Sequence, residues 1–150
     1  MSLDPQQLAR ASADAMWAQD NASKAMGMEI LEMGPGLARI TMTVRGDMVN
    51  GHDICHGGFI FTLADSAFAF ACNSHNLNAV AAGARIEFLA PARLGDQLTA
   101  VAKQISQGSR TGVYDSLVTN QNGKTVALFR GNSARIGGAL VDELTGETLQ

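Results

Sequence analysis

The sequence predicts an α+β fold in which an antiparallel sheet wraps around one long central helix. A segment over 59–75 is predicted to be helical and is apolar on almost every side, which is typical of an element enclosed by its own protein. Extended segments precede and follow it, and no helices separate the later ones, which disfavours an α/β crossover fold. With 150 residues, the chain has the size of one domain. We expect a single domain over 1–150, with about 137–150 as a mobile tail.

A short surface helix is expected near the N-terminus. Asp4 followed by Pro5 is a helix-start signature, because an acidic residue can cap the first turn and proline fits the first helical position. Apolar residues then recur at helical spacing, at Leu8, Ala11, Ala15 and Met16. Gly27 marks the expected end of this region.

Two extended segments are expected next, joined by a turn at Pro35-Gly36. In the second segment alternate residues are apolar and are expected to line one buried face: Ala38, Ile40, Met42 and Val44. Four further strands are expected after the central helix, at about 79–89, 97–106, 110–121 and 124–136. The sequence Gln121-Asn122-Gly123 predicts a hairpin turn between the last two.

The composition excludes several classes of protein. A hydrophobic fraction of 46% is enough for a core and excludes intrinsic disorder. A net charge of −3 argues against binding to nucleic acid. The longest apolar stretch, 59–72, is too short to cross a bilayer and is interrupted by polar residues, so no membrane partner is expected. Two cysteines and no signal-peptide pattern predict a reduced, cytoplasmic protein.

Asp65 is the strongest candidate for a catalytic residue. It is the only Asp, Glu, Lys or Arg between Ile54 and Ala84, and it lies in the middle of the apolar helix. A dehydrated carboxylate without a partner is costly, so such a group pairs, stays protonated or faces a ligand cleft. We therefore expect a catalytic acid, base or nucleophile. The alternative is a buried acid that is satisfied by a polar neighbour.

A glycine- and histidine-rich loop over 45–58 leads into this helix. Gly57 and Gly58 at a helix start leave backbone N–H groups unobstructed, and the helix dipole favours negative charge there. The site could therefore bind a carbonyl whose oxygen becomes negative in a transition state. The alternative is that the glycines only let the chain turn tightly against a neighbour.

The spacing of Gly57 and Asp65 predicts a site shared by two chains. Eight helical residues rise by about 12 Å, so the two groups of one chain cannot both lie about 3 Å from one carbonyl. A two-fold dimer with antiparallel central helices would bring Gly57 of one subunit opposite Asp65 of the other. We therefore expect function to require a homodimer.

Metal and thiol chemistry are the alternatives to carboxylate chemistry. His52, Cys55 and His56 lie in a loop without a second Cys/His cluster, so we expect no metal site. His56 is instead expected to orient Gly57 or the substrate. Cys72 is expected in the core, and Cys55 beside His56 is left as the alternative nucleophile.

The run from Asn50 to Phe68 carries the motif Asn-Gly-His-x-x-Cys-His-Gly-Gly-x-x-Phe-x-Leu-Ala-Asp-x-Ala-Phe. It resembles the hotdog-fold acyl-CoA thioesterases, and within them the PaaI type of the phenylacetate degradation pathway. Segments over 112–115 and 127–138 match the same type, so the likeness spans roughly 16–138. The resemblance implies a hotdog fold, with the sheet wrapped around the helix, and dimers that pair into a continuous sheet and usually form homotetramers.

The resemblance also implies roles for the site residues. Gly57 would give its N–H to the thioester carbonyl, and the acid at Asp65 of the partner subunit would act as general base on water or as nucleophile through a mixed anhydride. Asn50 and His56 would help to hold the substrate or a water. Some relatives place a Ser or Thr just after the helix to orient the water, whereas 81–84 is Ala-Ala-Gly-Ala. That role would fall to Ser66 or to a backbone group.

The predicted reaction is hydrolysis of an acyl-CoA thioester to free acid and coenzyme A, without a metal or bound cofactor. The resemblance favours phenylacetyl and hydroxyphenylacetyl groups. Residues 85–135 hold seven Lys or Arg against three acids, so this half could meet the CoA phosphates. The candidate substrate-binding residues are Asn50, Gly58, Ser66, Phe61, Arg110 and Arg130, with Phe59, Phe68 and Arg135 as further candidates. The phenylalanines could equally belong to the core.

Three alternatives to this function stay open. The preferred acyl group could be a medium or long chain. The protein could be a non-catalytic acyl-CoA-binding regulator on the same fold, although such regulators tend to lack the helix acid. A hotdog dehydratase or hydratase would need a histidine base and characteristic motifs that this sequence lacks.

Overall fold

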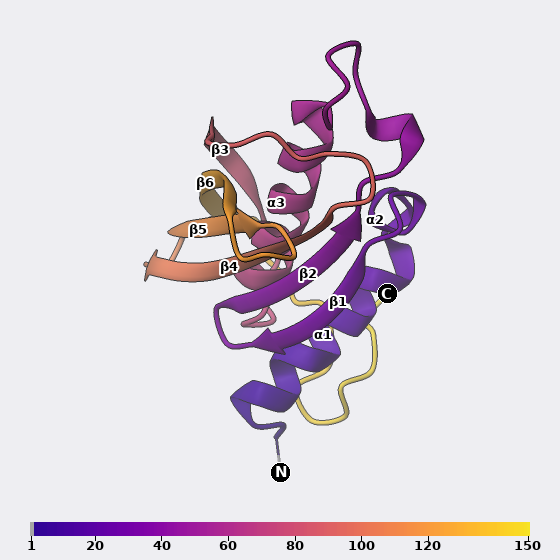
Figure 1. Ribbon diagram of the computed structural model, residues 1–150. Helices are drawn as coiled ribbons and strands as arrows, with labels where there is room; N and C mark the ends of the chain where they lie inside the picture. The colour runs from indigo at the N-terminus through magenta and orange to yellow at the C-terminus, as the bar shows by residue number, and fades with distance from the viewer. Residues whose placement is uncertain (1) are drawn as a thin grey trace.

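A computed structural model describes residues 2–150 (Figure 1). Within them the chain forms a six-stranded sheet, three α-helices and one 3-10 helix. The helices are α1 (Pro5–Gln19), α2 (Asn21–Ala25), η1 (Gly46–Met48) and α3 (Gly57–Cys72). The strands are β1 (Glu29–Gly34), β2 (Leu37–Thr43), β3 (Ala79–Phe88), β4 (Gln97–Gln107), β5 (Thr111–Thr119) and β6 (Thr125–Arg135).

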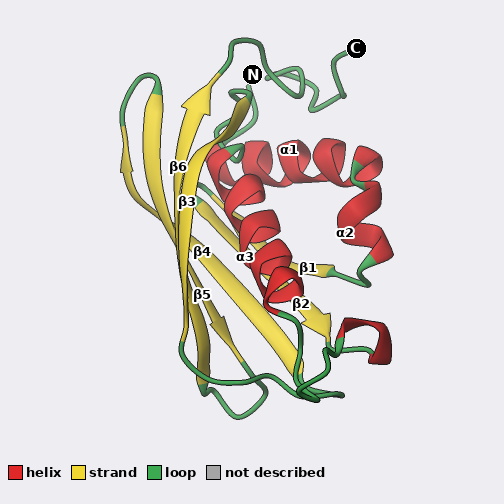
Figure 2. Ribbon diagram, turned by 90° about the horizontal axis from the view of Figure 1, so that it is seen from above, coloured by secondary structure: helices red, strands yellow, loops and turns green. Residues whose placement is uncertain are grey.

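The sheet curves around α3, which confirms the predicted α+β hotdog arrangement. Its strand order is β1-β2-β4-β5-β6-β3, and every neighbouring pair is antiparallel. Figure 2 shows α3 on the concave side of the sheet, with α1 and α2 on that same side. The chain crosses from α3 to the far end of the sheet, so β3 pairs only with β6 and is an edge strand.

The central position of α3 follows from its apolar sequence. Its buried residues are Ile60, Leu63, Ala64, Ala67, Phe68, Phe70, Ala71 and Cys72. The Phe68 ring packs on Tyr114 and Phe129, at centroid distances of 5.8 and 5.7 Å. Gly131 of β6 lies against the same ring, because a Cβ there would come within 2.8 Å of it. Among residues 2–150, no helix is both long and apolar enough to cross a membrane.

The ends of α3 differ from the predicted limits, 59–75. The helix begins at Gly57 because the preceding residue, His56, caps it. It ends at Cys72, where the Asn73 side chain donates to the carbonyl oxygens of Ala69 and Ala79, at 2.9 and 3.1 Å. This side chain therefore ties the helix end to the start of β3.

The inner faces of the strands supply the rest of the core. The four alternating residues predicted to be buried in and just after β2 are 0–1% exposed, which confirms that prediction. The four later strands also agree with their predicted ranges to within two residues at each end. The predicted hairpin turn is formed between β5 and β6, and Gly123 takes a φ of +78° there.

The N-terminal region divides into two helices. Asp4 caps α1 by accepting a hydrogen bond from the Gln7 N–H at 2.7 Å, as the sequence predicts. The chain breaks at Asp20, well before Gly27, because the Asp20 side chain caps a second helix by accepting from the Ser23 N–H at 2.9 Å. Gly27 then takes a φ of +71° before β1.

The C-terminal segment, 137–150, which the sequence predicts to be a mobile tail, makes hydrogen bonds with the rest of the domain. The buried Asn76 side chain accepts from the N–H groups of Leu140 and Val141, both at 2.9 Å, and donates to the Val141 carbonyl at 2.9 Å. The Val141 side chain is 1% exposed. Figure 1 shows the segment running beside α1. Asn78 also contacts the segment, because its backbone N–H donates to the Gly138 carbonyl at 3.1 Å.

Candidate active site

The loop before α3 is fixed by its own hydrogen bonds and by one neighbouring segment. The Asn50 Oδ1 accepts from the N–H groups of His52 and Ile54, at 3.0 and 3.4 Å. The Cys55 N–H donates to the Ala92 carbonyl at 2.7 Å, which links the loop to the segment after β3. Asn50 therefore shapes the loop through its carbonyl oxygen.

His56 and Gly57 form the start of α3. The His56 Nδ1 accepts from the Gly58 N–H at 2.9 Å, so this ring nitrogen acts as the cap and carries no proton there. Gly57 occupies the first helical position, whose N–H has no acceptor within the helix. No backbone acceptor lies elsewhere in the described residues. The Gly57 N–H is thus a free donor at the positive end of the helix dipole, suited to a carbonyl oxygen.

A pocket of about 400 Å³ lies between the loop and the segment after β3. Asn50 and Gly57 line it, as do Cys55 and apolar residues from both walls: Ile54, Ile60, Phe88, Leu89, Ala90, Pro91 and Ala92. Its size and apolar lining suit a small organic group. The structure therefore brings two of the predicted site residues together, Asn50 and Gly57, and does not bring Asp65 to the same pocket within one chain.

Asp65 lies farther along α3, on a stripe that the sheet does not cover. The stripe also holds Gly58, Thr62 and Ala69, all at least partly exposed. Asp65 is half-buried rather than enclosed, and within residues 2–150 it makes neither a hydrogen bond nor an ion pair with another side chain. Burial raises its pKa above the ordinary aspartate value. A carboxyl group in this state is a better proton acceptor than a fully solvated one.

Ser66 is turned away from the pocket. Its Oγ lies 2.9 Å from the Ser23 Oγ, which in turn donates to Asp20 Oδ2 at 2.7 Å. The hydroxyl therefore joins α3 to α2. Within one chain, the Ser66 hydroxyl does not line the pocket, where it was expected to orient a water.

The phenylalanines named as candidate pocket walls, for which the core was the favoured alternative, lie outside the pocket lining. Phe61 packs edge-on against Phe129 at 5.3 Å, Phe68 lies in the core, and Phe59 packs against His56 at 6.2 Å. The aromatic wall of the pocket is Phe88, which the sequence analysis missed. The apolar run 88–92, which begins at the last residue of the mostly exposed strand β3, could have indicated this wall from the sequence.

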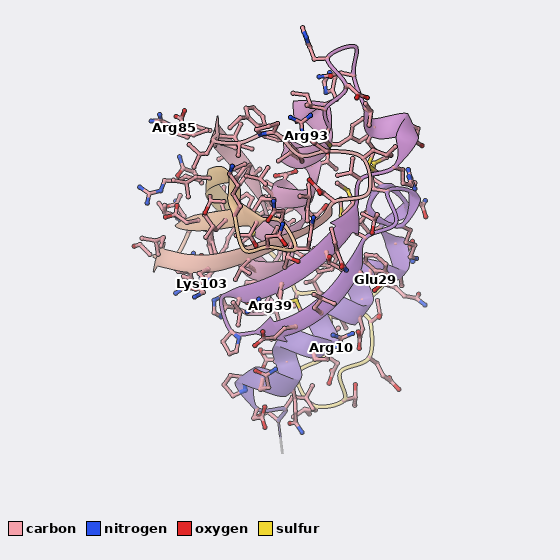
Figure 3. All side chains as sticks on the ribbon, viewed as in Figure 1. Arg10, Glu29, Arg39, Arg85, Arg93 and Lys103 are labelled. Carbon is pink, nitrogen blue, oxygen red and sulfur yellow. The ribbon has the colours of Figure 1, made fainter. Side chains whose placement is uncertain are left out.

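The arginines expected at the CoA phosphates lie on β6 and in the turn before β5, away from the pocket lining. Arg130 makes two hydrogen bonds with Asp115, at 2.6 and 2.8 Å, on the outer face of the sheet. This pairing lowers the pKa of Asp115. Arg135 donates to the carbonyl oxygens of residues 108 and 109. Figure 3 shows Arg85, the neighbour of Arg130 across the strands, projecting from the sheet edge.

Thiol and metal chemistry find little support in the site. Burial raises the pKa of the Cys55 thiol to about 11 and that of Cys72 to about 12, so both are protonated near neutral pH. Both cysteines are free and buried. Within residues 2–150, no group of three or more His, Cys, Asp or Glu side chains could hold a metal ion.

Comparisons with known proteins agree on one family. A sequence profile described as the thioesterase superfamily matches residues 52–127. The chain is 54% identical over 132 residues to the acyl-coenzyme A thioesterase PaaI of Escherichia coli, covering 88% of this chain and 94% of that protein. The solved structure of E. coli PaaI, from the phenylacetic acid degradation operon, has a TM-score of 0.89 at 52% identity, covering 91% of this chain and 99% of that one. A Streptococcus mutans protein solved with bound acetyl CoA has a TM-score of 0.73 at 28% identity, covering 75% and 90%.

Proposed function

Because the chain belongs to the thioesterase superfamily and is an acyl-CoA thioesterase, we propose that it hydrolyses phenylacetyl-CoA-type and hydroxyphenylacetyl-CoA-type thioesters to the free acid and coenzyme A. The observation that carries the substrate class is the apolar pocket of about 400 Å³, with an aromatic wall, directly beside Gly57. A phenyl ring one methylene away from a carbonyl fits a pocket of this size. The similarity to PaaI of the phenylacetic acid degradation operon supports the same class.

The thioester carbonyl binds at the start of α3 in this proposal. The free Gly57 N–H donates to the carbonyl oxygen and stabilises the negative charge that develops there. His56, whose Nδ1 fixes the Gly58 N–H at 2.9 Å, keeps the first turn in shape and faces the substrate with its remaining ring nitrogen. Asn50 helps to hold the substrate or a water through the part of its side chain that the loop leaves free.

The carboxylate that completes the site comes from a second copy of the chain. Gly57 and Asp65 are separated by about 12 Å of helix, so Asp65 cannot serve the pocket of its own subunit. β3 is a ten-residue edge strand whose residues are mostly exposed, including Val80 at 47%. An unpaired apolar edge beside the exposed stripe of α3 is a surface that a second copy could cover in a two-fold arrangement. We propose that two such dimers form a homotetramer, as the resemblance to the family implies.

Two chemical routes are open to Asp65. As a general base, it takes a proton from water while the water oxygen attacks the carbonyl carbon; the C–S bond then breaks and the coenzyme A thiolate takes a proton. As a nucleophile, its carboxylate attacks the carbonyl carbon and expels the thiolate, and water then hydrolyses the mixed anhydride. Neither route needs a metal or an organic cofactor. Cys55, with a thiol pKa of about 11, is a poor substitute for either role.

The nucleotide end of coenzyme A is expected at the positive half of the chain. Arg110 and Arg130 remain the proposed phosphate ligands, although Arg130 would have to share its guanidinium with Asp115. Two free buried thiols are compatible with a reducing compartment, and we propose the cytoplasm.

The substrate class is tested by assaying thiol release from phenylacetyl-, hydroxyphenylacetyl-, hexanoyl- and palmitoyl-CoA. We expect kcat/KM to be highest for the two aromatic substrates. Asp65→Asn should lower kcat by about 10²- to 10⁴-fold on all of them, while Asp14→Asn, on the exposed face of α1, should change it little. A preference for palmitoyl-CoA would overturn the substrate class, and normal turnover by Asp65→Asn would overturn the role of the acid.

A further inference from the structure

Phe88 is the side chain that lies against Gly57. A Cβ built on Gly57 would lie 2.9 Å from Phe88 Cζ and 3.2 Å from Cε1, so the ring would have to shift to admit it. Gly57 is not one of the glycines with positive φ, so its backbone conformation does not demand glycine. The tip of the Phe88 ring therefore rests on the residue whose N–H faces the reacting carbonyl.

The ring is also free to contact a ligand. Phe88 is 53% exposed in the single chain. Each of the other five phenylalanines packs on an aromatic ring at a centroid distance of 6.3 Å or less, whereas Phe88 has no such partner within residues 2–150. Phe88 lines the same pocket as Gly57. An unpaired phenyl ring at this place can offer its face or edge to a second ring.

We propose that Phe88 is a specificity-determining residue, which selects aromatic acyl groups by ring–ring contact beside the thioester carbonyl. The inference rests on the proposed function, because it assumes that the carbonyl binds at Gly57. Only one methylene separates the ring of a phenylacetyl group from its carbonyl. The substrate ring then falls within the roughly 4.5–7 Å at which aromatic pairs attract. An aliphatic chain in the same pocket loses this interaction and keeps only general apolar contact.

The test compares selectivity rather than activity alone. We would measure kcat and KM for phenylacetyl-CoA and hexanoyl-CoA in the wild type, Phe88→Leu and Phe88→Ala. Leu94→Ala is the control, since Leu94 is 64% exposed and lies outside the pocket lining. Thermal melting and size-exclusion chromatography would show whether each variant folds and assembles as the wild type does.

Phe88→Leu keeps apolar bulk and removes only the ring. We expect the ratio of kcat/KM for phenylacetyl-CoA over hexanoyl-CoA to fall by roughly two- to tenfold, mainly through KM, with no change in Leu94→Ala. If the wild type prefers the aromatic substrate and Phe88→Leu keeps the full ratio, the inference is overturned and the proposed substrate class stands. If the wild type shows no aromatic preference, both are overturned.

Discussion

Asp65 is unusual because it is partly desolvated and has no partner in the single chain. Burial raises its pKa, so between the unfolded and folded values the native state binds more protons than the unfolded state. Stability therefore falls as pH rises through this window, and the loss persists at neutral pH. An aspartate that lowers stability in this way is expected to belong to a functional site rather than to have a structural role.

This electrostatic cost predicts that Asp65→Asn unfolds at a higher temperature than the wild type at pH 7. The difference should shrink as pH falls and vanish below about pH 3, where the aspartate is protonated in both states. Melting curves across this range check it. Asp14→Asn is the control, because Asp14 is exposed and paired with Arg10 at 3.1 Å. An equal or lower melting temperature at pH 7 would count against the desolvated carboxylate.

The contact between Gly57 and Phe88 gives a second prediction at this scale. Gly57→Ala keeps the backbone N–H but forces the ring to move, so we expect kcat/KM for hexanoyl-CoA to fall by roughly 10- to 100-fold. Alanine is a better helix former than glycine, so the melting temperature should not fall with it. Adding Phe88→Ala removes the collision and should restore much of the activity. A double variant as inactive as Gly57→Ala would show that the ring is not the cause.

Among the elements, the C-terminal segment is anchored in part by one side chain that lies far away in sequence. Asn76 is 2% exposed and has a φ of +62°, a conformation that asparagine tolerates better than most residues. Its three hydrogen bonds to residues 140 and 141 hold the segment beside α1. The start of this segment lies at the end of α3 away from Gly57, so its role is structural.

Asn76→Gly keeps the backbone freedom and removes the three hydrogen bonds. We expect a loss of about 2 kcal/mol of unfolding free energy and faster proteolytic cleavage within 137–150. Per-active-site kcat should stay unchanged. Denaturant unfolding and limited proteolysis measure the two effects, with Asn122→Ala in the exposed hairpin turn as control. Wild-type resistance to the protease would mean that other contacts hold the segment.

At the scale of the whole molecule, the proposed site needs two copies of α3. Gly57, with its free N–H, lines the pocket at the start of α3, whereas the Asp65 carboxylate lies farther along the same helix. The edge strand β3 leaves one side of the sheet open. These features become one site only if a second chain supplies Asp65. The assembly is therefore part of the proposed chemistry and not an addition to it.

Mixing two inactive variants tests this shared site. Gly57→Pro removes the N–H donor at a helical position that accepts proline, and its ring also presses on Phe88 as alanine would. Asp65→Asn removes the carboxylate. After subunit exchange, random pairing makes half of the dimers mixed, each with one intact site, so about a quarter of wild-type activity should return. Native mass spectrometry confirms the exchange. Exchange without recovered activity would place both groups in one chain.

The sequence by itself determined the elements and the reactive groups. Period-two and helical patterns are local, so the strands and the apolar helix could be predicted from the chain alone, although the helix limits were placed two to three residues late. The lone charge between Ile54 and Ala84 was equally visible, because desolvation cost depends first on composition. The distance between Gly57 and Asp65 followed from helical rise.

Only the tertiary structure decided which residues line the pocket and what holds the ends of the chain. Phe88 and Gly57 meet because β3 crosses to the sheet edge, and Asn76 reaches residues 140 and 141 across more than sixty positions. The contacts of Ser66 with Ser23 and of Arg130 with Asp115 likewise join segments that lie apart in the sequence. Contacts of this kind depend on how segments that are distant in sequence pack together, and no local sequence pattern predicts that packing.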